Sequence, residues 1–167
     1  MNSGNIKVGD IVYKVKKVDI NDIVSDIDIM IAHTGDAKEE TLCEHSELTY
    51  QYLVRLFNEK GIGTIVTGLI ETMICEKEPL TNECVELIKE MLVNAVYLHD
   101  IGKINPAFQK KLGNEKVDSV GLNYKKHSIF SALIFIDIFT SKIEQVNSKT
   151  HIKYLYNVLY SFAYQIS

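Results

Sequence analysis

The sequence predicts an all-α domain with a short strand or hairpin at its N-terminus. Apolar residues recur three and four positions apart along most of the chain, which is the period of an amphipathic helix. The chain has only nine glycines and two prolines, too few for long linkers. With 167 residues, 46% of them hydrophobic, it can bury one sizeable core.

The N-terminal residues show a different pattern. Ile11, Tyr13 and Val15 alternate with polar residues, which predicts the short strand. We expect residues 1–28 to form an N-terminal extension and residues 29–167 to form the domain. The polar start of the chain is unlike a signal peptide. The longest apolar run, residues 129–139, is short and contains Asp137, so we expect no membrane span.

The first predicted helix begins after Thr41. The string Thr41-Leu42-Cys43-Glu44 is a capping box, in which the Thr41 hydroxyl and the Glu44 carboxylate bind free backbone amides. Gly61 is expected to end this helix. Its apolar stripe includes one histidine, His45, and otherwise consists of Leu42, Leu48, Tyr52, Leu53, Leu56 and Phe57.

Two more helices are predicted before residue 102. The first covers residues 64–76, is weakened by Gly68 and ends before Pro79. The second has a stripe that, extended by one turn, places His99 and Asp100 on the inward face. Gly102 is expected to end that helix and to leave Lys103 in an exposed loop. The stripe consists of Cys84, Val85, Ile88, Met91, Leu92, Ala95 and Val96.

The rest of the chain is also mostly helical. Asn105-Pro106 predicts the cap and first residue of a short helix through Leu112, followed by a loop over residues 113–123. His127 begins a helix through Ser141, with inward residues Phe130, Ile134, Phe135, Ile138 and Phe139. A last helical pattern covers residues 152–166 and has no terminating Gly or Pro, and His151 at its start is expected to be exposed.

Three histidines and one aspartate thus lie on the core-facing edges of three predicted helices. A single buried histidine is usually satisfied by a backbone carbonyl, and that alternative holds for each one taken separately. Together, buried imidazoles and a carboxylate need partners that one bound cation would supply. The sequence therefore predicts a divalent-metal site formed by His45, His99, Asp100 and His127.

These residues resemble the HD-domain metal-dependent phosphohydrolases, and among them the CRISPR-associated HD nuclease. The resemblance covers residues from about 29 to the end of the chain. The strings that carry it are Ala32-His33-Thr34, Glu40-Thr41-Leu42-Cys43-Glu44-His45, Leu98-His99-Asp100-Ile101-Gly102-Lys103, Pro106-Ala107-Phe108-Gln109 and His127-Ser128-Ile129-Phe130-Ser131-Ala132.

The resemblance implies a role for each site residue. His45, His99 and Asp100 would hold one metal, and Asp100 would bridge to a second metal that His127 helps to bind. Lys103 would stand near the scissile phosphate, so that Lys103 and Asp100 are the catalytic candidates. His33 resembles a position that borders the site. The family's later His-His-Gly segment and a further acidic ligand are absent.

That departure predicts a domain truncated at its C-terminal side. We expect the 167-residue chain to be the N-terminal portion of a longer protein. With the ligands present, we expect at most one well-occupied metal and weak or absent nuclease activity. Imidazole ligands with one carboxylate favour Mn, Fe, Co or Ni over Mg, which prefers oxygen ligands.

The expected partners are single-stranded DNA and a helicase domain or CRISPR effector complex, without a membrane. The net charge of −4 does not favour DNA binding by itself, but residues 103–126 contain six lysines against two acids. An HD phosphohydrolase acting on nucleotides or cyclic nucleotides, and a non-catalytic docking module, are the alternatives. Three cysteines without metal spacing suggest a reducing cytoplasm.

Overall fold

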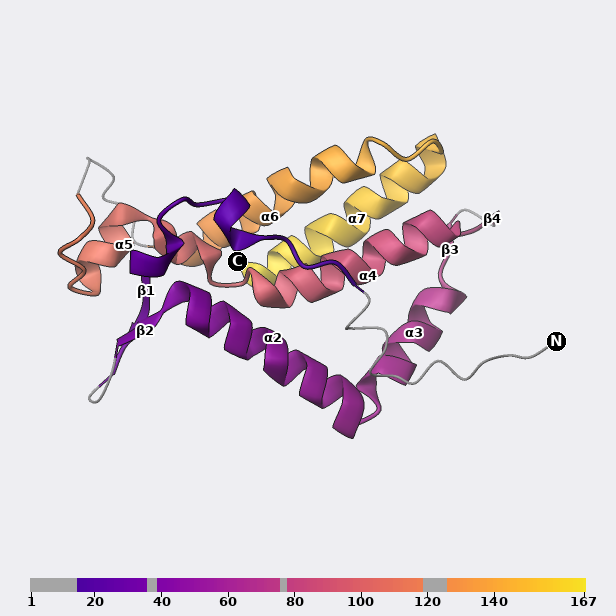
Figure 1. The fold of residues 1–167 in the computed structure, drawn as a ribbon. Helices are drawn as coiled ribbons and strands as arrows, with labels where there is room; N and C mark the ends of the chain where they lie inside the picture. The colour runs from indigo at the N-terminus through magenta and orange to yellow at the C-terminus, as the bar shows by residue number, and fades with distance from the viewer. Residues whose placement is uncertain (1–14, 36–38, 76–77, 119–125) are drawn as a thin grey trace.

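The computed structural model describes residues 15–35, 39–75, 78–118 and 126–167. Its secondary structure is mostly helical, which confirms the predicted fold class (Figure 1). The short elements are 3-10 helices and strands of two to four residues. In chain order the elements are η1 (Ile20–Asp22), η2 (Ile27–Ile29), β1 (Ile31–Thr34), β2 (Glu39–Thr41), α2 (Leu42–Glu59), α3 (Ile62–Thr72), β3 (Ile74–Cys75), β4 (Glu78–Pro79), α4 (Asn82–Tyr97), η3 (Ile101–Ile104), α5 (Pro106–Lys111), α6 (His127–Ile143) and α7 (Lys149–Ile166).

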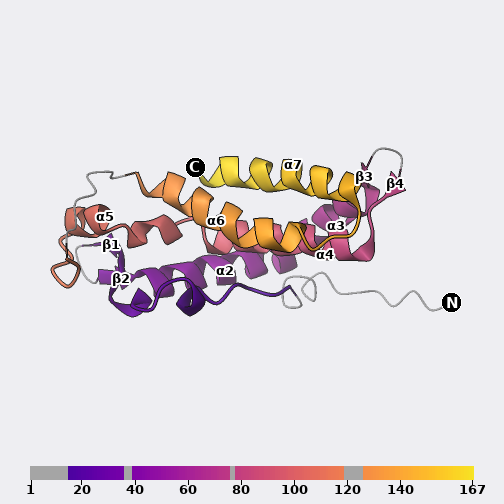
Figure 2. The same cartoon turned by 90° about the horizontal axis from the view of Figure 1, so that it is seen from above.

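The long helices pack around α4. Helix α4 contacts α2 on one side and α7 on the other, and α6 runs antiparallel to α7 (Figures 1 and 2). Phe135 and Phe139 of α6 are fully buried against Leu155 and Leu159 of α7 in the main hydrophobic core. The end of α7 therefore lies near the start of α6 (Figure 2). No helix in the described part of the chain is long and apolar enough to cross a membrane.

The predicted strand over residues 11–15 falls almost entirely outside the described residues. Ile11 and Tyr13 lie outside the described residues, and Val15 is buried in a bend. Strands β1 and β2 form a short antiparallel hairpin directly before α2. The pairing is irregular between Ile31 and His33, which is a feature of β-bulges. Because β2 runs directly into α2, this hairpin brings β1 beside the first turn of that helix.

Helix α2 begins as predicted but turns a different face to the core. Thr41 accepts a hydrogen bond from the Glu44 amide at 3.2 Å, and the Glu44 carboxylate accepts one from the Thr41 amide at 3.1 Å. The expected inward residues Leu48, Tyr52 and Leu56 are 44–57% exposed. Leu42 and Phe57 are buried as predicted, together with Ser46 and Val54. The core-facing stripe is therefore rotated relative to the predicted one, because α4 packs beside it.

The C-terminal helices largely follow the predicted pattern. Asn105 caps α5 by accepting a hydrogen bond from the Ala107 amide at 2.9 Å, and α6 begins at His127 as predicted. His151, expected to be exposed, is buried. It lies four residues before Leu155 and so shares the buried stripe of α7. The predicted helix over 64–76 ends at Thr72, because residues 74–75 (β3) pair with residues 78–79 (β4).

Candidate metal centre

The His99-Asp100 pair lies in a turn after α4. Helix α4 ends at Tyr97, and Gly102 lies within η3, so the prediction that the helix continues to Gly102 is wrong. The Ile101 amide donates to the Leu98 carbonyl at 3.0 Å, which continues the chain in a tighter 3-10 turn. This turn directs the Asp100 side chain toward α2 and α6.

Asp100 is the centre of the site. Its Oδ2 lies 3.1 Å from His45 Nε2 and 3.4 Å from His99 Nε2. Its Oδ1 lies 3.2 Å from His127 Nε2. Asp100 itself is buried. The structure thus brings all four predicted ligands together, from α2, the turn after α4, and the first residue of α6.

The second ring nitrogens of two histidines are held by other groups. His99 Nδ1 lies 2.9 Å from the Val96 carbonyl, and His45 Nδ1 lies 3.2 Å from Glu40 Oε2. Binding of a carbonyl or carboxylate by Nδ1 places its proton there and leaves Nε2 with a free lone pair. Metal-binding histidines in proteins are commonly oriented in this way.

The chemistry of the donor atoms fits a bound cation. His45 Nε2 is buried and lies near Asp100 Oδ2, but it forms no hydrogen bond among the described residues. A neutral imidazole nitrogen and a carboxylate oxygen are both electron-pair donors, so a cation between them would satisfy both. His45, Asp100 and His33 offer ligand atoms that all lie within 4.8 Å of one another.

His33 joins the predicted ligands from the hairpin. It lies on β1, and its ring is 4.8 Å from the His45 ring in an edge-on arrangement. The sequence suggested only that this residue borders the site. His33 and His45 are twelve residues apart in the sequence, and His33 lies outside the helix, so helical spacing could not predict that the two rings are close in space. Glu40, which contacts His45, was given no role in the predicted site, because the contact depends on how β2 enters α2.

Lys103 is buried, in contrast to the predicted exposed position. Its ammonium lies 2.8 Å from Asp100 Oδ2, donates to the Ala32 carbonyl at 3.0 Å and lies 3.3 Å from His33 Nε2. An ammonium has three N–H donors, and these three contacts account for all of them. A direct contact with a phosphate would therefore require Lys103 to exchange one of its present partners.

Burial and neighbouring charges shift the pKa values of the acid and of two histidines in the site. Burial acts to raise the pKa of Asp100, but the hydrogen bond from Lys103 and the nearby His99 and His127 lower it below its ordinary value. Burial lowers the pKa of His33, and the charge of Lys103 adds to that effect. Burial also lowers the pKa of His127. Neutral imidazole and ionised carboxylate are the forms that bind a metal.

Lys103→Met should destabilise the metal-free protein by about 3 kcal/mol, because a buried carboxylate loses its cationic partner and the Ala32 carbonyl loses its donor. The aliphatic side chain of methionine keeps most of the packing. Urea denaturation in the presence of a chelator measures the effect. Lys110 is exposed, so Lys110→Met serves as the matched control and should change stability by less than about 0.5 kcal/mol. Equal stability of the two variants would show that the Lys103 contacts contribute little.

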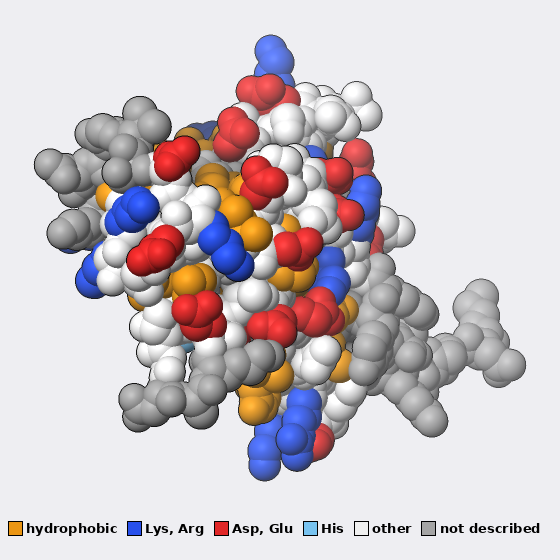
Figure 3. All heavy atoms as spheres, turned by 60° about the vertical axis from the view of Figure 1, so that its left-hand side comes forward, with side chains coloured by type: hydrophobic (Ala, Val, Ile, Leu, Met, Phe, Trp, Pro, Cys, Tyr) orange, Lys and Arg blue, Asp and Glu red, His pale blue; other side chains and the backbone are white. Residues whose placement is uncertain are grey.

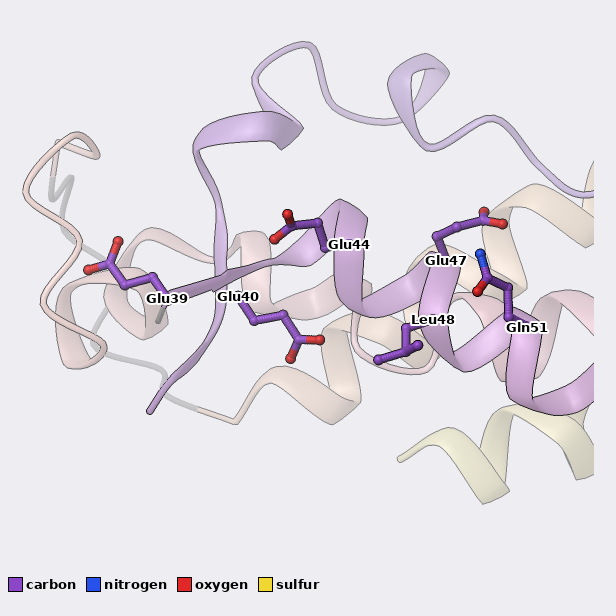
Figure 4. Close-up of a pocket in the computed structure, with 6 residues that line it drawn as sticks. All are labelled: Glu39, Glu40, Glu44, Glu47, Leu48 and Gln51. Carbon is purple, nitrogen blue, oxygen red and sulfur yellow. The ribbon is translucent and has the colours of Figure 1, made fainter. Parts of the chain in front are cut away.

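Two of the surface cavities that the described residues form adjoin the site on different sides. One, of about 500 Å³, is lined by Glu39 and Glu40 of β2 and by four residues of α2, namely Glu44, Glu47, Leu48 and Gln51 (Figure 4). The other, also about 500 Å³, lies at the start of α6 and is lined by Phe108, Lys111, Lys126, His127, Ser128, Ile129 and Ser167. The first cavity is acidic and the second basic. An anionic substrate is therefore favoured on the α5 and α6 side.

The wider surface has mixed charge. On the face shown in Figure 3, acidic side chains are spread among Lys and Arg. Lys111 also lies 5.4 Å from the centre of the Phe108 ring, which in turn packs edge-on against His127 at 4.6 Å. The local basic character near His127 thus contrasts with the net negative charge of the chain.

The fold and this cluster define a helical domain of the HD type, in which a His-Asp pair is the centre of a metal-binding site. The family model described as Cas3, HD domain, matches residues 32–160, and the chain belongs to this family. The matched range contains all of the residues around Asp100 described above. No curated protein and no solved structure gives a significant match. The domain is accordingly an HD-type nuclease module of CRISPR systems, of a family that binds divalent metals.

Proposed function

We propose that this chain is the nuclease module of a protein that cleaves single-stranded DNA in CRISPR interference, with divalent metal held by His45, His99, Asp100 and His127. The observation that carries the proposal is the convergence of these ligands, and of His33, on one buried carboxylate. The two oxygens of Asp100 face different histidines, which suits a bridging role between two metals. The imidazole-rich set favours Mn, Fe, Co or Ni over Mg.

A bound divalent metal would supply a nucleophilic water of lowered pKa and neutralise charge on the phosphate. The protein's own groups then have distinct tasks. Lys103 holds Asp100 in its ionised form, and it is placed to stabilise negative charge if it exchanges a partner for phosphate. Lys111 and Lys126, beside His127, would attract the phosphate backbone, whereas the glutamates on the other side would repel it.

The test is a cleavage assay with the purified chain in Mn²⁺, Ni²⁺ and Mg²⁺. Labelled single-stranded DNA, duplex DNA, nucleotides and cyclic nucleotides are compared under the same conditions. We expect at most weak cleavage of single-stranded DNA by this chain, faster in Mn²⁺ or Ni²⁺ than in Mg²⁺, and its loss in Asp100→Asn. Hydrolysis of nucleotides without cleavage of DNA would instead support the alternative phosphohydrolase.

A docking role is the second candidate function. Large apolar side chains are exposed on α6 (Ile129 and Leu133) and on α7 (Tyr160 and Tyr164). They lie in the first half of α6 and the second half of α7, two antiparallel helices that are side by side in Figure 2. Such a surface favours contact with a protein, and we propose a helicase domain or effector complex as the partner, in the cytoplasm. Replacing Leu133 and Tyr164 by serine should abolish binding to that partner without changing metal binding.

A further inference from the structure

The side chain of Gln109 pairs with strand β1. Gln109 lies on α5 and is completely buried. Its Oε1 accepts a hydrogen bond from the Ile31 amide at 2.9 Å, and its Nε2 donates to the Ile31 carbonyl at 2.9 Å. One carboxamide thus binds both polar groups of one strand residue, as a neighbouring strand would. Ile31 is followed directly by Ala32 and His33, which belong to the metal centre.

The same carboxamide also binds the turn that carries Asp100. Its Nε2 donates to the Lys103 carbonyl at 2.7 Å. Its Oε1 accepts a further hydrogen bond from Asn114 Nδ2 at 2.7 Å, and Asn114 is itself buried and donates to the Ile29 carbonyl at 2.8 Å. Both donors and both acceptor positions of the amide are therefore used.

These contacts form a continuous series of hydrogen bonds that connects β1 to η3 through the metal centre. Gln109 joins the backbone of Ile31 to the backbone of Lys103. The Lys103 ammonium then reaches the Ala32 carbonyl and lies between Asp100 and His33. Strand β1 carries His33, and η3 follows Asp100 directly; the buried side-chain amide of Gln109 binds the backbone of both elements.

We propose that Gln109 is a positioning residue of the metal centre, which fixes His33 of β1 relative to Asp100. This inference rests on the proposed metal site, takes His33 as a further ligand of it, and adds a residue that touches no ligand atom. Groups behind the ligands commonly change metal affinity by about 10- to 100-fold when they are removed. A leucine at this position would leave three backbone groups, at Ile31 and Lys103, without the partner they now have.

The test measures Mn²⁺ and Ni²⁺ affinity by calorimetry in Gln109→Leu, His33→Ala and the double variant. We expect Gln109→Leu to weaken binding by about tenfold or more. Because the effect acts through His33, adding Gln109→Leu to His33→Ala should cause little further loss. Gln145 is exposed in the turn after α6, so Gln145→Leu is the matched control and should bind like the wild type. Circular dichroism confirms that each variant is folded.

Two results would overturn the proposal. One is wild-type affinity in Gln109→Leu. The other is an equal loss with and without His33, which would indicate a general effect on stability. If Gln109→Leu does not fold, Asn114→Ala is used instead, because it removes one hydrogen bond to the Gln109 side chain. Asn114→Ala should weaken metal binding by less than the tenfold expected for Gln109→Leu, and this loss should also disappear in the His33→Ala background. Unchanged affinity in folded Asn114→Ala would then also contradict the proposal.

A metal-free measurement separates this proposal from the proposed function. If the wild-type chain binds neither Mn²⁺ nor Ni²⁺, the proposed metal-dependent function is contradicted. The positioning role of Gln109 is then tested by NMR of the metal-free protein. In the metal-free protein, Gln109→Leu should shift the ring nitrogen signals of His33 and speed hydrogen exchange at the Ile31 amide. Gln145→Leu should change neither. His33 signals that are identical in both variants would refute the positioning role.

Discussion

Asp100→Ala should abolish stoichiometric binding of Mn²⁺ and Ni²⁺. Both carboxylate oxygens of Asp100 face histidines. Without Asp100, the imidazoles of His45, His99 and His127 remain on separate elements and no longer share a carboxylate. We expect affinity to fall by at least about 100-fold, because a direct ligand is removed and not only an outer partner. Calorimetry and metal analysis of the dialysed protein provide the measurement.

The Asp100 experiment needs a variant that keeps the fold. Alanine leaves the buried Lys103 ammonium without its carboxylate, which is itself destabilising. Asp100→Asn keeps an oxygen that can accept from Lys103, while its neutral amide is a poor metal ligand. Asp137 is exposed on α6, so Asp137→Asn is the control for loss of one acid. Unchanged metal affinity in Asp100→Asn would refute the ligand assignment.

Gly102→Ala should strongly destabilise the protein, because the added methyl group has no room beside α6. A Cβ at residue 102 would lie 2.0 Å from the His127 carbonyl oxygen, 2.6 Å from the Ser131 amide and 2.8 Å from Phe130 Cβ. Two of these atoms are backbone, so α6 itself would have to move. Gly102 also donates its amide to Ser131 Oγ at 2.8 Å, a contact that depends on the same close approach.

We expect Gly102→Ala to lower the unfolding free energy by about 3 kcal/mol or more, since overpacking against backbone cannot be relieved by a rotamer change. It should also weaken metal binding, because displacement of α6 moves His127 away from Asp100. Thermal unfolding and calorimetry measure the two effects.

Gly68→Ala is a control with the opposite expected sign. Gly68 lies within α3, and a Cβ there would meet no atom within 4 Å. Alanine should therefore stabilise the protein by about 0.5–1 kcal/mol through helix propensity. If both glycine variants had the same stability, the close approach of α6 to Gly102 would not be a determinant of the fold.

Local pattern was sufficient for most of the helices. The capping box at Thr41, the cap at Asn105 and the start of α6 at His127 are all where the sequence predicts them. These features depend on hydrogen bonds within a few residues, so they can be recognised without knowledge of the tertiary structure. The His-Asp pair was predicted to be the centre of a metal site from its position after an apolar helix.

Tertiary packing decided what the pattern left open. Lys103 is buried because β1 lies against η3, and His151 is buried because the first turn of α7 faces the core. In α2 the opposite occurs: Leu48, Tyr52 and Leu56, which were expected to be buried, are exposed. The spacing of apolar residues alone does not specify which face of the helix a neighbouring helix will cover.

Contacts between distant segments were the least accessible to sequence reasoning. Gln109 is 78 residues from its partner Ile31, and Gly102 is 29 residues from Ser131. The sequence by itself determined the helical class and predicted residues 45, 99, 100 and 127 as metal ligands. Only the tertiary structure placed His33, Glu40 and Gln109 around them, because no local spacing encodes the approach of a hairpin to a turn.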